Sequence, residues 1–290
     1  MWKINLAVGV AVLAVLAVRW RATQMQVTDK QYVGLEVTLL DRHAVCVGCT
    51  SGIGKGIALR LAEMGADVTV FGRNTILGEE IVREMTDRTF PNGRHDFVQT
   101  DASSMKSISE SVQRYLDSRP TQPVHFLVQS QGMATMAGRT ETSEGIDQKL
   151  ALHYYGRVLF NRLLSDRMRE TALDHEFNDV RSLSVLSGGV HSAYDNLGDI
   201  DLKHHFSLPN AANAAGFYND LAADQLSRDS EYLGITSKDP KRGISYIHAA
   251  PGMVNTTWGK DFPWYALYPV RLLQHFLAKS PEECAKLMID

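Results

Sequence analysis

The chain has 290 residues, 44% of them hydrophobic, which is enough for one large α/β core or at most two small ones. It has 30 basic and 33 acidic residues, a net charge of −3 and no Lys/Arg-rich run, so nucleic-acid binding has no electrostatic support. Its three cysteines, Cys46, Cys49 and Cys284, have neither disulfide-framework nor zinc-site spacing, which suits a reducing compartment and predicts no metal site.

The N-terminal segment, residues 1–22, predicts a single membrane anchor. Ile4–Val18 is apolar with one exception, and tryptophans and basic residues flank it, as membrane interfaces favour. A helix from Trp2 to Trp20 would measure about 28 Å, close to the hydrocarbon core of a bilayer. A cleaved signal peptide and an organelle transit peptide are the alternatives, although Arg19 and Arg21 stand where a signal peptide needs small residues. The two arginines favour a cytosolic body. The expected membrane is that of the endoplasmic reticulum or another organelle.

Residues 23–40 are polar and mixed and predict a linker, and residues 41–290 form one domain. A short apolar strand, Ala44–Val47, leads into Gly48, Gly52 and Gly54 and then into a helical pattern. A dinucleotide site requires this context, because glycines let the backbone approach a pyrophosphate and a helix N-terminus supplies free N–H groups. A purely structural glycine turn is the alternative. No Gly-Lys-Ser/Thr follows at the spacing of a phosphate P-loop.

The stretch Gly48-Cys49-Thr50-Ser51-Gly52-Ile53-Gly54 resembles the cofactor loop of the short-chain dehydrogenases/reductases. The resemblance runs from about Asp41 to the end of the chain. It implies a Rossmann-type, doubly wound parallel sheet in three α/β/α layers, with the strand order 3-2-1-4-5-6. It also implies that the dinucleotide contacts Gly48, Thr50, Ser51, Gly52, Ile53 and Gly54.

The end of the second strand, Asp67–Phe71, indicates the type of cofactor. The chain continues with Gly72-Arg73-Asn74 and has no Asp or Glu there to bind a ribose 2′-hydroxyl. Arg73 can pair with a 2′-phosphate, which favours NADP over NAD; an exposed surface arginine is the alternative. After the third strand, Asp96–Thr100, the resemblance implies that Asp101 binds the adenine amino group, with a helix N-cap as its competing role.

The fourth strand, Val124–Val128, leads to Gln129-Ser130-Gln131-Gly132, where the family has Asn-Asn-Ala-Gly. The resemblance assigns Gln131 and Gly132 to the cofactor. A long helix is predicted within Thr142–Met168. In it, His153 occupies the place of the family's asparagine that holds a proton-relay water, and a packed helix histidine is the alternative.

Two catalytic residues are expected after the fourth strand. Ser187 ends the strand Arg181–Ser187 and matches the family's serine, which hydrogen-bonds the substrate oxygen; an ordinary strand-end serine is the alternative. An inserted segment, Gly189–Gly216, precedes a helix over Phe217–Ser227. Tyr218 matches the family's acid/base, which also contacts the cofactor, but Ala222 stands where the family has a lysine four residues later. A structural Tyr218 is the alternative.

The sixth strand, Gly243–His248, is followed by a segment that resembles the family's Pro-Gly-x-Val-x-Thr motif. The resemblance implies cofactor contacts from Pro251, Gly252, Val254 and Thr256. Residues at about 257–279 correspond to a substrate lid. Their many large apolar side chains indicate a hydrophobic substrate or a membrane-facing surface, with plain core packing as the alternative.

These residues predict an oxidoreductase that transfers a hydride between NADP(H) and a hydroxyl or carbonyl of an apolar substrate, with Ser187, Tyr218 and His153 as its catalytic residues. The chain resembles membrane-tethered reductases of the family that act on lipids, steroids or retinoids. A homodimer is possible, since family members commonly form one. Because the lysine is absent, a second hypothesis stands: a membrane-tethered dinucleotide-binding scaffold or sensor with little or no turnover.

Overall fold

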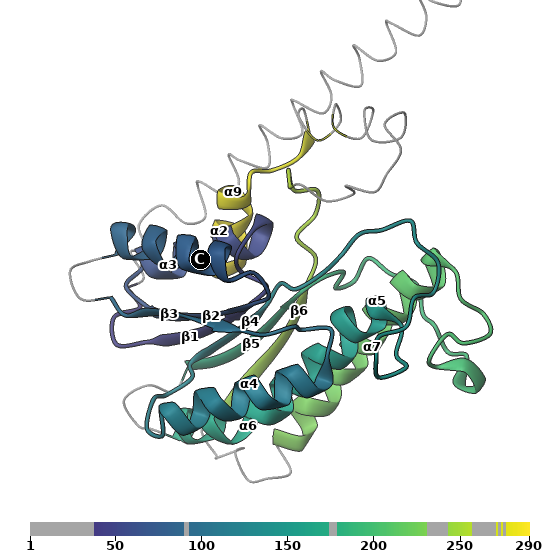
Figure 1. Cartoon of the computed structure of the whole chain (residues 1–290), viewed down its shortest axis with the longest axis horizontal. Coiled ribbons are helices and arrows are strands. Elements are labelled where there is room, and N and C mark those ends of the chain that lie inside the picture. Colours follow the sequence, from purple (N-terminus) through teal and green to yellow (C-terminus); the bar gives the residue numbers. More distant parts are fainter. Residues whose placement is uncertain are drawn as a thin grey trace, which may run out of the picture.

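A computed structural model describes residues 38–89, 93–173, 179–230, 243–256, 271, 274 and 277–290. Within these residues, six parallel strands form one sheet in the order β3-β2-β1-β4-β5-β6, and helices cover both faces (Figure 1). The predicted strand order and three-layer architecture are confirmed. The expected anchor at 1–22 and most of the expected lid at 257–279 lie outside the described residues. Among those described, no helix has the length and apolar character to cross a membrane.

The sheet is built around its most buried strand. The strands in chain order are β1 (His43–Val47), β2 (Asp67–Gly72), β3 (His95–Gln99), β4 (Phe126–Gln129), β5 (Asp179–Val185) and β6 (Gly243–Ala249). All five residues of β1 are buried, because β2 and β4 flank it and helices pack on both of its faces. Since every strand is parallel to its neighbours, all carboxyl ends meet at one edge, where the predicted site residues follow their strands.

The helices form two layers (Figure 1). One layer contains α2 (Gly52–Glu63), α3 (Thr75–Arg88) and α9 (Pro281–Ile289), and the other contains α4 (Met105–Ser118), α6 (Gly156–Leu173) and α7 (Leu208–Ser230). In front of α6, the short α5 (Gln148–Leu150) and a π-helical turn at Ala151–Tyr155 interrupt the single helix that the sequence predicts. Single π turns inside helices often occur at functional sites.

Helix α7 begins nine residues before the predicted start, at Leu208, so the insertion after β5 is shorter than expected. The Ser207 hydroxyl accepts a hydrogen bond from the Asn210 backbone N–H at 3.1 Å, which stabilises the first turn.

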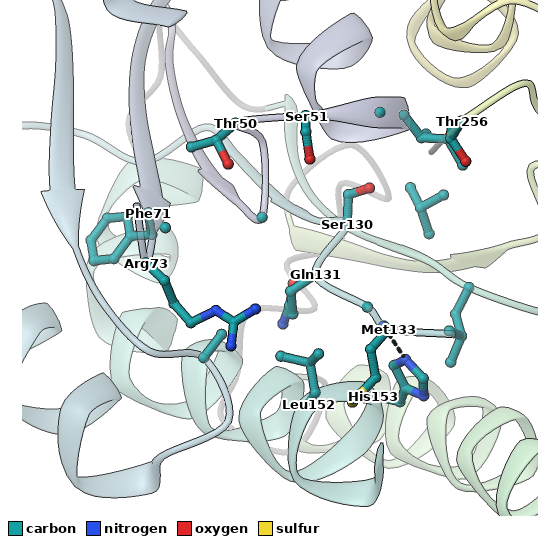
Figure 2. Close-up of a pocket in the computed structure, with 18 of the residues that line it drawn as sticks. Thr50, Ser51, Phe71, Arg73, Ser130, Gln131, Met133, Leu152, His153 and Thr256 are labelled. Carbon is teal, nitrogen blue, oxygen red and sulfur yellow. Dashed lines mark hydrogen bonds between the residues drawn. The ribbon is translucent and has the colours of Figure 1, made fainter. Parts of the chain in front are cut away.

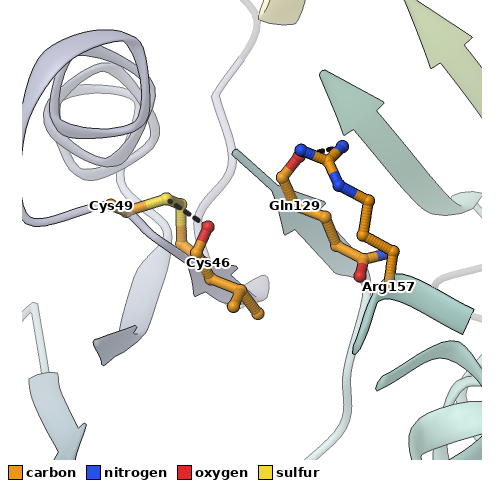
Figure 3. The surroundings of a disulfide bond; sticks show 5 residues. Cys46, Cys49, Gln129 and Arg157 are labelled. Carbon is orange, nitrogen blue, oxygen red and sulfur yellow. Dashed lines mark hydrogen bonds between the residues drawn. A yellow bond between two sulfur atoms is a disulfide. The ribbon is translucent and has the colours of Figure 1, made fainter. Parts of the chain in front are cut away.

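The prediction for the cysteines is wrong in one respect. Cys46, in β1, and Cys49, in the glycine loop, form a disulfide across a Cα–Cα distance of 5.7 Å (Figure 3). Gly48, at a φ of +74°, turns the chain back at the end of β1 and brings the two residues together. Both residues of the bridge are fully buried, and Cys284 is free and buried.

Candidate active site

A cleft of about 870 Å³ opens at the carboxyl ends of the central strands (Figure 2). It brings together segments as far apart in the sequence as Gly48 and Thr256. The predicted cofactor-binding residues that line it are Gly48, Thr50, Ser51, Gly52, Ile53, Arg73, Gln131, Gly132, Pro251 and Thr256. His153, predicted as catalytic, lines it too.

The N-terminus of α2 forms an anion cradle on one wall of the cleft. Its N-cap residue, Ser51, makes no side-chain cap bond, and the first turn has no acidic residue. The first N–H groups of α2 are therefore available to a ligand, as is the positive end of the helix dipole. Gly54 does not line the cleft, but a Cβ there would lie 2.5 Å from the Gly48 carbonyl oxygen. It therefore allows α2 to pack closely on the loop.

Arg73 lies at the end of β2 and points its guanidinium into the cleft (Figure 2). Thr100 and Ala102 line the same end, but Asp101 between them does not. The Asp101 carboxylate instead accepts hydrogen bonds from the backbone N–H and hydroxyl of Ser103, at 2.9 and 2.7 Å. Ser104, not Asp101, is the N-cap of α4. The structure therefore supports neither role expected for Asp101.

The segment after β6 closes the cleft on the side of α2. A Cβ on Gly52 would lie 3.3 Å from the Cγ2 atom of Thr256, so loop and segment are in close contact. Gly252 and Val254 do not line the cleft. Val254 is buried and forms a β-bridge with Lys279, and Gly252 adopts a left-handed turn at a φ of +71°. These two residues shape the segment without facing a ligand.

His153 holds the loop that follows β4. Its Nε2 atom accepts a hydrogen bond from the Met133 backbone N–H at 2.9 Å (Figure 2). Burial, together with the positive charges of Arg157 and Lys149, lowers the pKa of His153 to about 3. The imidazole is therefore neutral near pH 7 and acts as an acceptor. In this arrangement it positions Gly132 and Met133.

Arg157, which sequence reasoning missed, lies beneath the cleft and is 1% exposed. Its Nη1 atom donates to the backbone oxygens of Gln129 and Val185, each at 3.1 Å, and to the Ser184 hydroxyl at 2.6 Å. Its Nη2 atom donates to the Gln131 oxygen at 2.6 Å, and Figure 3 shows the guanidinium against Gln129. Burial lowers the pKa of Arg157 to about 9, so the charge remains at neutral pH. Arg157 thus ties the carboxyl ends of β4 and β5 together.

Ser187 lies two residues beyond the end of β5, next to Leu186, which lines the cleft. The Ser187 hydroxyl oxygen is buried and has no hydrogen-bond partner among the described residues. Its backbone N–H donates to Nε2 of His248 at 3.2 Å, and its backbone oxygen accepts from Nδ1 of His191 at 2.9 Å. A buried hydroxyl without a partner, on a backbone held from both sides, is poised for a ligand atom.

Known proteins resemble this chain in sequence and in fold. The family model described as short chain dehydrogenase matches residues 42–173. An oxidoreductase of Emericella nidulans is 31% identical over 223 residues, which are 76% of this chain and 61% of that protein. The polyprenol dehydrogenase of Homo sapiens is 28% identical over 245 residues, 84% of this chain and 70% of that protein.

The chain belongs to the short-chain dehydrogenase/reductase family. Among solved structures, the Pseudomonas aeruginosa RhlG/NADP active-site complex matches with a TM-score of 0.63 and 19% identity, over 88% of this chain and 90% of that one. A short-chain dehydrogenase/reductase from Serratia marcescens matches with a TM-score of 0.61 and 18% identity, over 86% and 89%. At these identities the two structures show a shared fold.

Within the described residues, Tyr218, which matches the family's tyrosine in the sequence, does not lie at the Ser187 hydroxyl. Tyr218 does not line the cleft formed by the described residues, and its hydroxyl donates to the Ile200 backbone oxygen at 3.3 Å. Its ring packs against those of Tyr154 and Tyr194, at centroid distances of 5.2 and 6.3 Å. Burial and the neighbouring acidic groups raise the pKa of Tyr218 to about 12. On α7 it is Gly216, not Tyr218, that faces Ser187, so the structure gives the predicted role of Tyr218 no support.

Proposed function

We propose that this protein is an NAD(P)-dependent oxidoreductase that transfers a hydride between NADP(H) and a hydroxyl or carbonyl group of an apolar substrate. One observation carries the proposal. A single cleft contains the anion cradle at the N-terminus of α2 and the guanidinium of Arg73. The same cleft is lined by Leu186, which precedes Ser187, whose buried hydroxyl has no hydrogen-bond partner among the described residues.

The residues of the cleft fit a dinucleotide. A Cβ on Gly48 would lie 2.5 Å from backbone atoms of Gln131, so glycine lets the loop after β1 lie directly against the loop after β4 beside the N-terminus of α2. The helix N-terminus would hold a pyrophosphate, and Arg73 would hold a 2′-phosphate, as a charge-assisted pair. The other end of the ligand would then extend toward Leu186, Pro251 and Thr256. When bound, the cofactor supplies the hydride, and the protein supplies its alignment.

An apolar substrate is supported by three observations. The human relative is named a polyprenol dehydrogenase. Two methionines are exposed in the segments that follow β4 and β6: Met133 lines the cleft, and Met253 lies two residues after the cleft-lining Pro251. The sequence at 257–279 is rich in large apolar residues. We further propose a tether through residues 2–20, with the body on the cytosolic side of an organelle membrane, and a homodimer as its assembly.

A specific observation favours a second candidate, a dinucleotide-binding scaffold or sensor. The Tyr218 hydroxyl is bonded to a backbone oxygen away from the cleft, and no lysine follows it at the fourth position. Under this hypothesis the cradle of α2 binds NADP(H) but no proton donor serves a carbonyl. The two candidates therefore differ in turnover, not in cofactor binding.

The test uses the full chain in detergent, with NADPH or NADH and a panel of long-chain, isoprenoid and retinoid aldehydes and ketones. We expect NADPH-dependent reduction. We also expect Arg73→Ala to raise the KM for NADPH about 10- to 100-fold, because a charge-assisted phosphate contact is lost, and to leave the KM for NADH unchanged. Arg83→Ala, on the exposed side of α3, is the matched control. NADPH binding without turnover would favour the scaffold, and absence of dinucleotide binding would exclude both candidates.

A further inference from the structure

Arg157 is a buried positive charge without a negative partner in the described part of the chain. It is 1% exposed, and its four hydrogen bonds end on neutral oxygens, those of the Gln129, Gln131 and Val185 backbone and of the Ser184 hydroxyl. Its Nε atom has no hydrogen-bond partner among the described residues. Burial lowers its pKa, and no described carboxylate raises it. The charge of this guanidinium is therefore not offset by the residues around it.

Lys149, a second buried cation, has the counter-charge that Arg157 lacks. Its Nζ atom lies 3.8 Å from Oδ2 of the buried Asp147. Asp220, the carboxylate that acts on His248 together with Arg157, is hydrogen-bonded to that histidine and is 44% exposed. A charge that is removed from water without a partner costs folding free energy. The charge of Arg157 therefore remains to act on a ligand in the cleft.

Arg157 lies on the His153 side of the cleft, away from Arg73. It follows His153 by one helical turn and lines the cleft, and its Nη1 atom reaches the oxygen of Val185, the last residue of β5. In Figure 2, Arg73 lies on the left and His153 on the right. The charge of Arg157 helps to lower the pKa of His153 and of His248. The field of the guanidinium therefore reaches the wall of the cleft on this side.

A nicotinamide dinucleotide differs in charge between its oxidation states at one place. The nicotinamide ring carries a positive charge when oxidised and is neutral when reduced, whereas the phosphates are the same in both forms. In the orientation of the proposed function, Arg73 holds the 2′-phosphate and the N-terminus of α2 holds the pyrophosphate. The ring then lies beyond these contacts, on the side of the cleft where Arg157 acts. A like charge disfavours the charged form of a group.

We propose that Arg157 makes the cleft select the reduced dinucleotide over the oxidised one. This inference rests on the proposed function, because it takes the orientation of the dinucleotide from it. The guanidinium opposes the positive charge of the oxidised ring, so NADP⁺ binds more weakly than NADPH. At an effective dielectric constant of about 20, two like charges about 10 Å apart change an affinity roughly tenfold. Because Arg157 is buried, salt screens this effect much less than it screens a surface charge.

Binding of three ligands separates the ring from the phosphates. NADPH, NADP⁺ and 2′-phospho-ADP-ribose, which has the phosphates but no nicotinamide, are titrated calorimetrically into the full chain in detergent. In the wild type we expect the Kd of NADP⁺ to be roughly tenfold above that of NADPH. In Arg157→Met this ratio should fall to about one, and NADP⁺ should gain affinity relative to 2′-phospho-ADP-ribose. Arg162→Met, which removes an exposed charge from the same helix, is the matched control and should leave the ratio unchanged.

The ratio of the two Kd values also separates the charge of Arg157 from its hydrogen bonds. Loss of the bonds between β4 and β5 would weaken all three ligands by one factor. Arg157→Lys keeps the charge and loses the planar fork, so it should weaken binding and keep the ratio. Ser184→Asp places a carboxylate against Nη1 and should lower the ratio, whereas Ser184→Asn, of equal size and uncharged, should keep it. If Arg157→Met does not fold, the two Ser184 variants decide the question.

The outcomes distinguish this inference from the proposed function. Equal affinity of the wild type for NADPH and NADP⁺ would overturn the inference, as would a ratio that Arg157→Met or Ser184→Asp leaves unchanged. Turnover of a carbonyl in that protein would leave the oxidoreductase standing. A preference for NADPH that these variants remove, in a protein that reduces no carbonyl, would support the inference and favour the scaffold. If the wild type binds no dinucleotide, both are wrong.

Discussion

Gly48 is the residue at which the loops after β1 and β4 meet beside the cleft. It has a φ of +74°, and a Cβ there would lie 2.5 Å from both the Cα and the backbone nitrogen of Gln131. Its own N–H donates to the Phe71 oxygen at 2.9 Å. The loop after β1 can therefore lie directly against the loop after β4, which leaves the N-terminus of α2 facing the cleft.

Gly48→Ala should lower the free energy of unfolding by about 3 kcal/mol and weaken NADPH binding, because the methyl group adds a backbone clash to the cost of a left-handed conformation. Gly189→Ala is a matched control. Gly189 has nearly the same φ, +72°, but nothing within 4 Å of its Cβ position. Only the conformational cost, about 1 kcal/mol, should remain there. Equal losses in chemical denaturation would contradict the role of the close approach.

At the scale of elements, the junction of β1 and α2 combines a glycine turn with a covalent bridge. The Cys46–Cys49 disulfide spans a sequence separation of three and encloses Val47 and Gly48. Figure 3 shows the bridge between the strand and the loop that leads into the helix. It therefore restrains the segment that forms the anion cradle.

Reduction of this bridge should destabilise the protein. In the loop-entropy model, a bridge that closes so short a loop contributes about 2 kcal/mol. We expect a reductant to lower the Tm of the wild type and to leave a Cys46→Ala/Cys49→Ala variant unchanged, since that variant has no bridge to lose. Thermal unfolding with and without reductant measures both. A Tm that is insensitive to reductant in the wild type would show that the bridge does not stabilise the fold.

Sequence patterns predicted the sheet well because its central strands β1, β2 and β4 are short, mainly apolar runs flanked by glycine or polar residues. The motif residues after β1 and β4 reach the cleft because parallel strands present their carboxyl ends together. The side chains of α7 were not predictable in this way. Successive side chains of an α-helix point about 100° apart around its axis. Gly216 and Tyr218 are two residues apart and therefore lie on nearly opposite faces of α7, so that only one of them can face Ser187.

The remaining members of the site are joined only by the tertiary structure. His191 and His248 lie 57 positions apart and meet because β5 and β6 are neighbours in the sheet. Arg157 follows His153 by four residues, so both lie on one face of the helix. This spacing was the one indication in the sequence that Arg157 belongs to the site. Its four acceptors could not be inferred, because three of them are backbone oxygens of other elements.

For the whole molecule, buried histidines link stability to pH. His43, in β1, is 3% exposed and has Pro123 and Thr69 as hydrogen-bond partners, at 3.0 Å each. Burial lowers the pKa of His43 from 6.5 to about 4. Below pH 6.5 the unfolded chain therefore binds a proton that the folded chain refuses, so the stability contributed by neutral His43 is lost as the pH falls from 6.5 toward 4.

We expect the free energy of unfolding to fall by about 2 kcal/mol between pH 7 and pH 5 on account of His43 alone. His43→Gln should be less stable at pH 7 and should show a correspondingly shallower decrease. Urea denaturation of both proteins at several pH values measures the difference. Equal slopes in the two proteins would indicate that His43 titrates normally in the folded state.

The Cys46–Cys49 disulfide in the glycine loop couples reduction of the bridge to binding of the dinucleotide. Disulfide and pyrophosphate cradle share the same few residues, Cys46 to Ile53. Dinucleotide binding and disulfide reduction form one thermodynamic cycle. If the intact bridge changes the affinity for the dinucleotide by some factor, bound dinucleotide must change the equilibrium constant for reduction of the bridge by the same factor. A bridge that strengthens dinucleotide binding would thus be protected by the bound dinucleotide, and a bridge that weakens binding would be reduced more easily in the occupied protein.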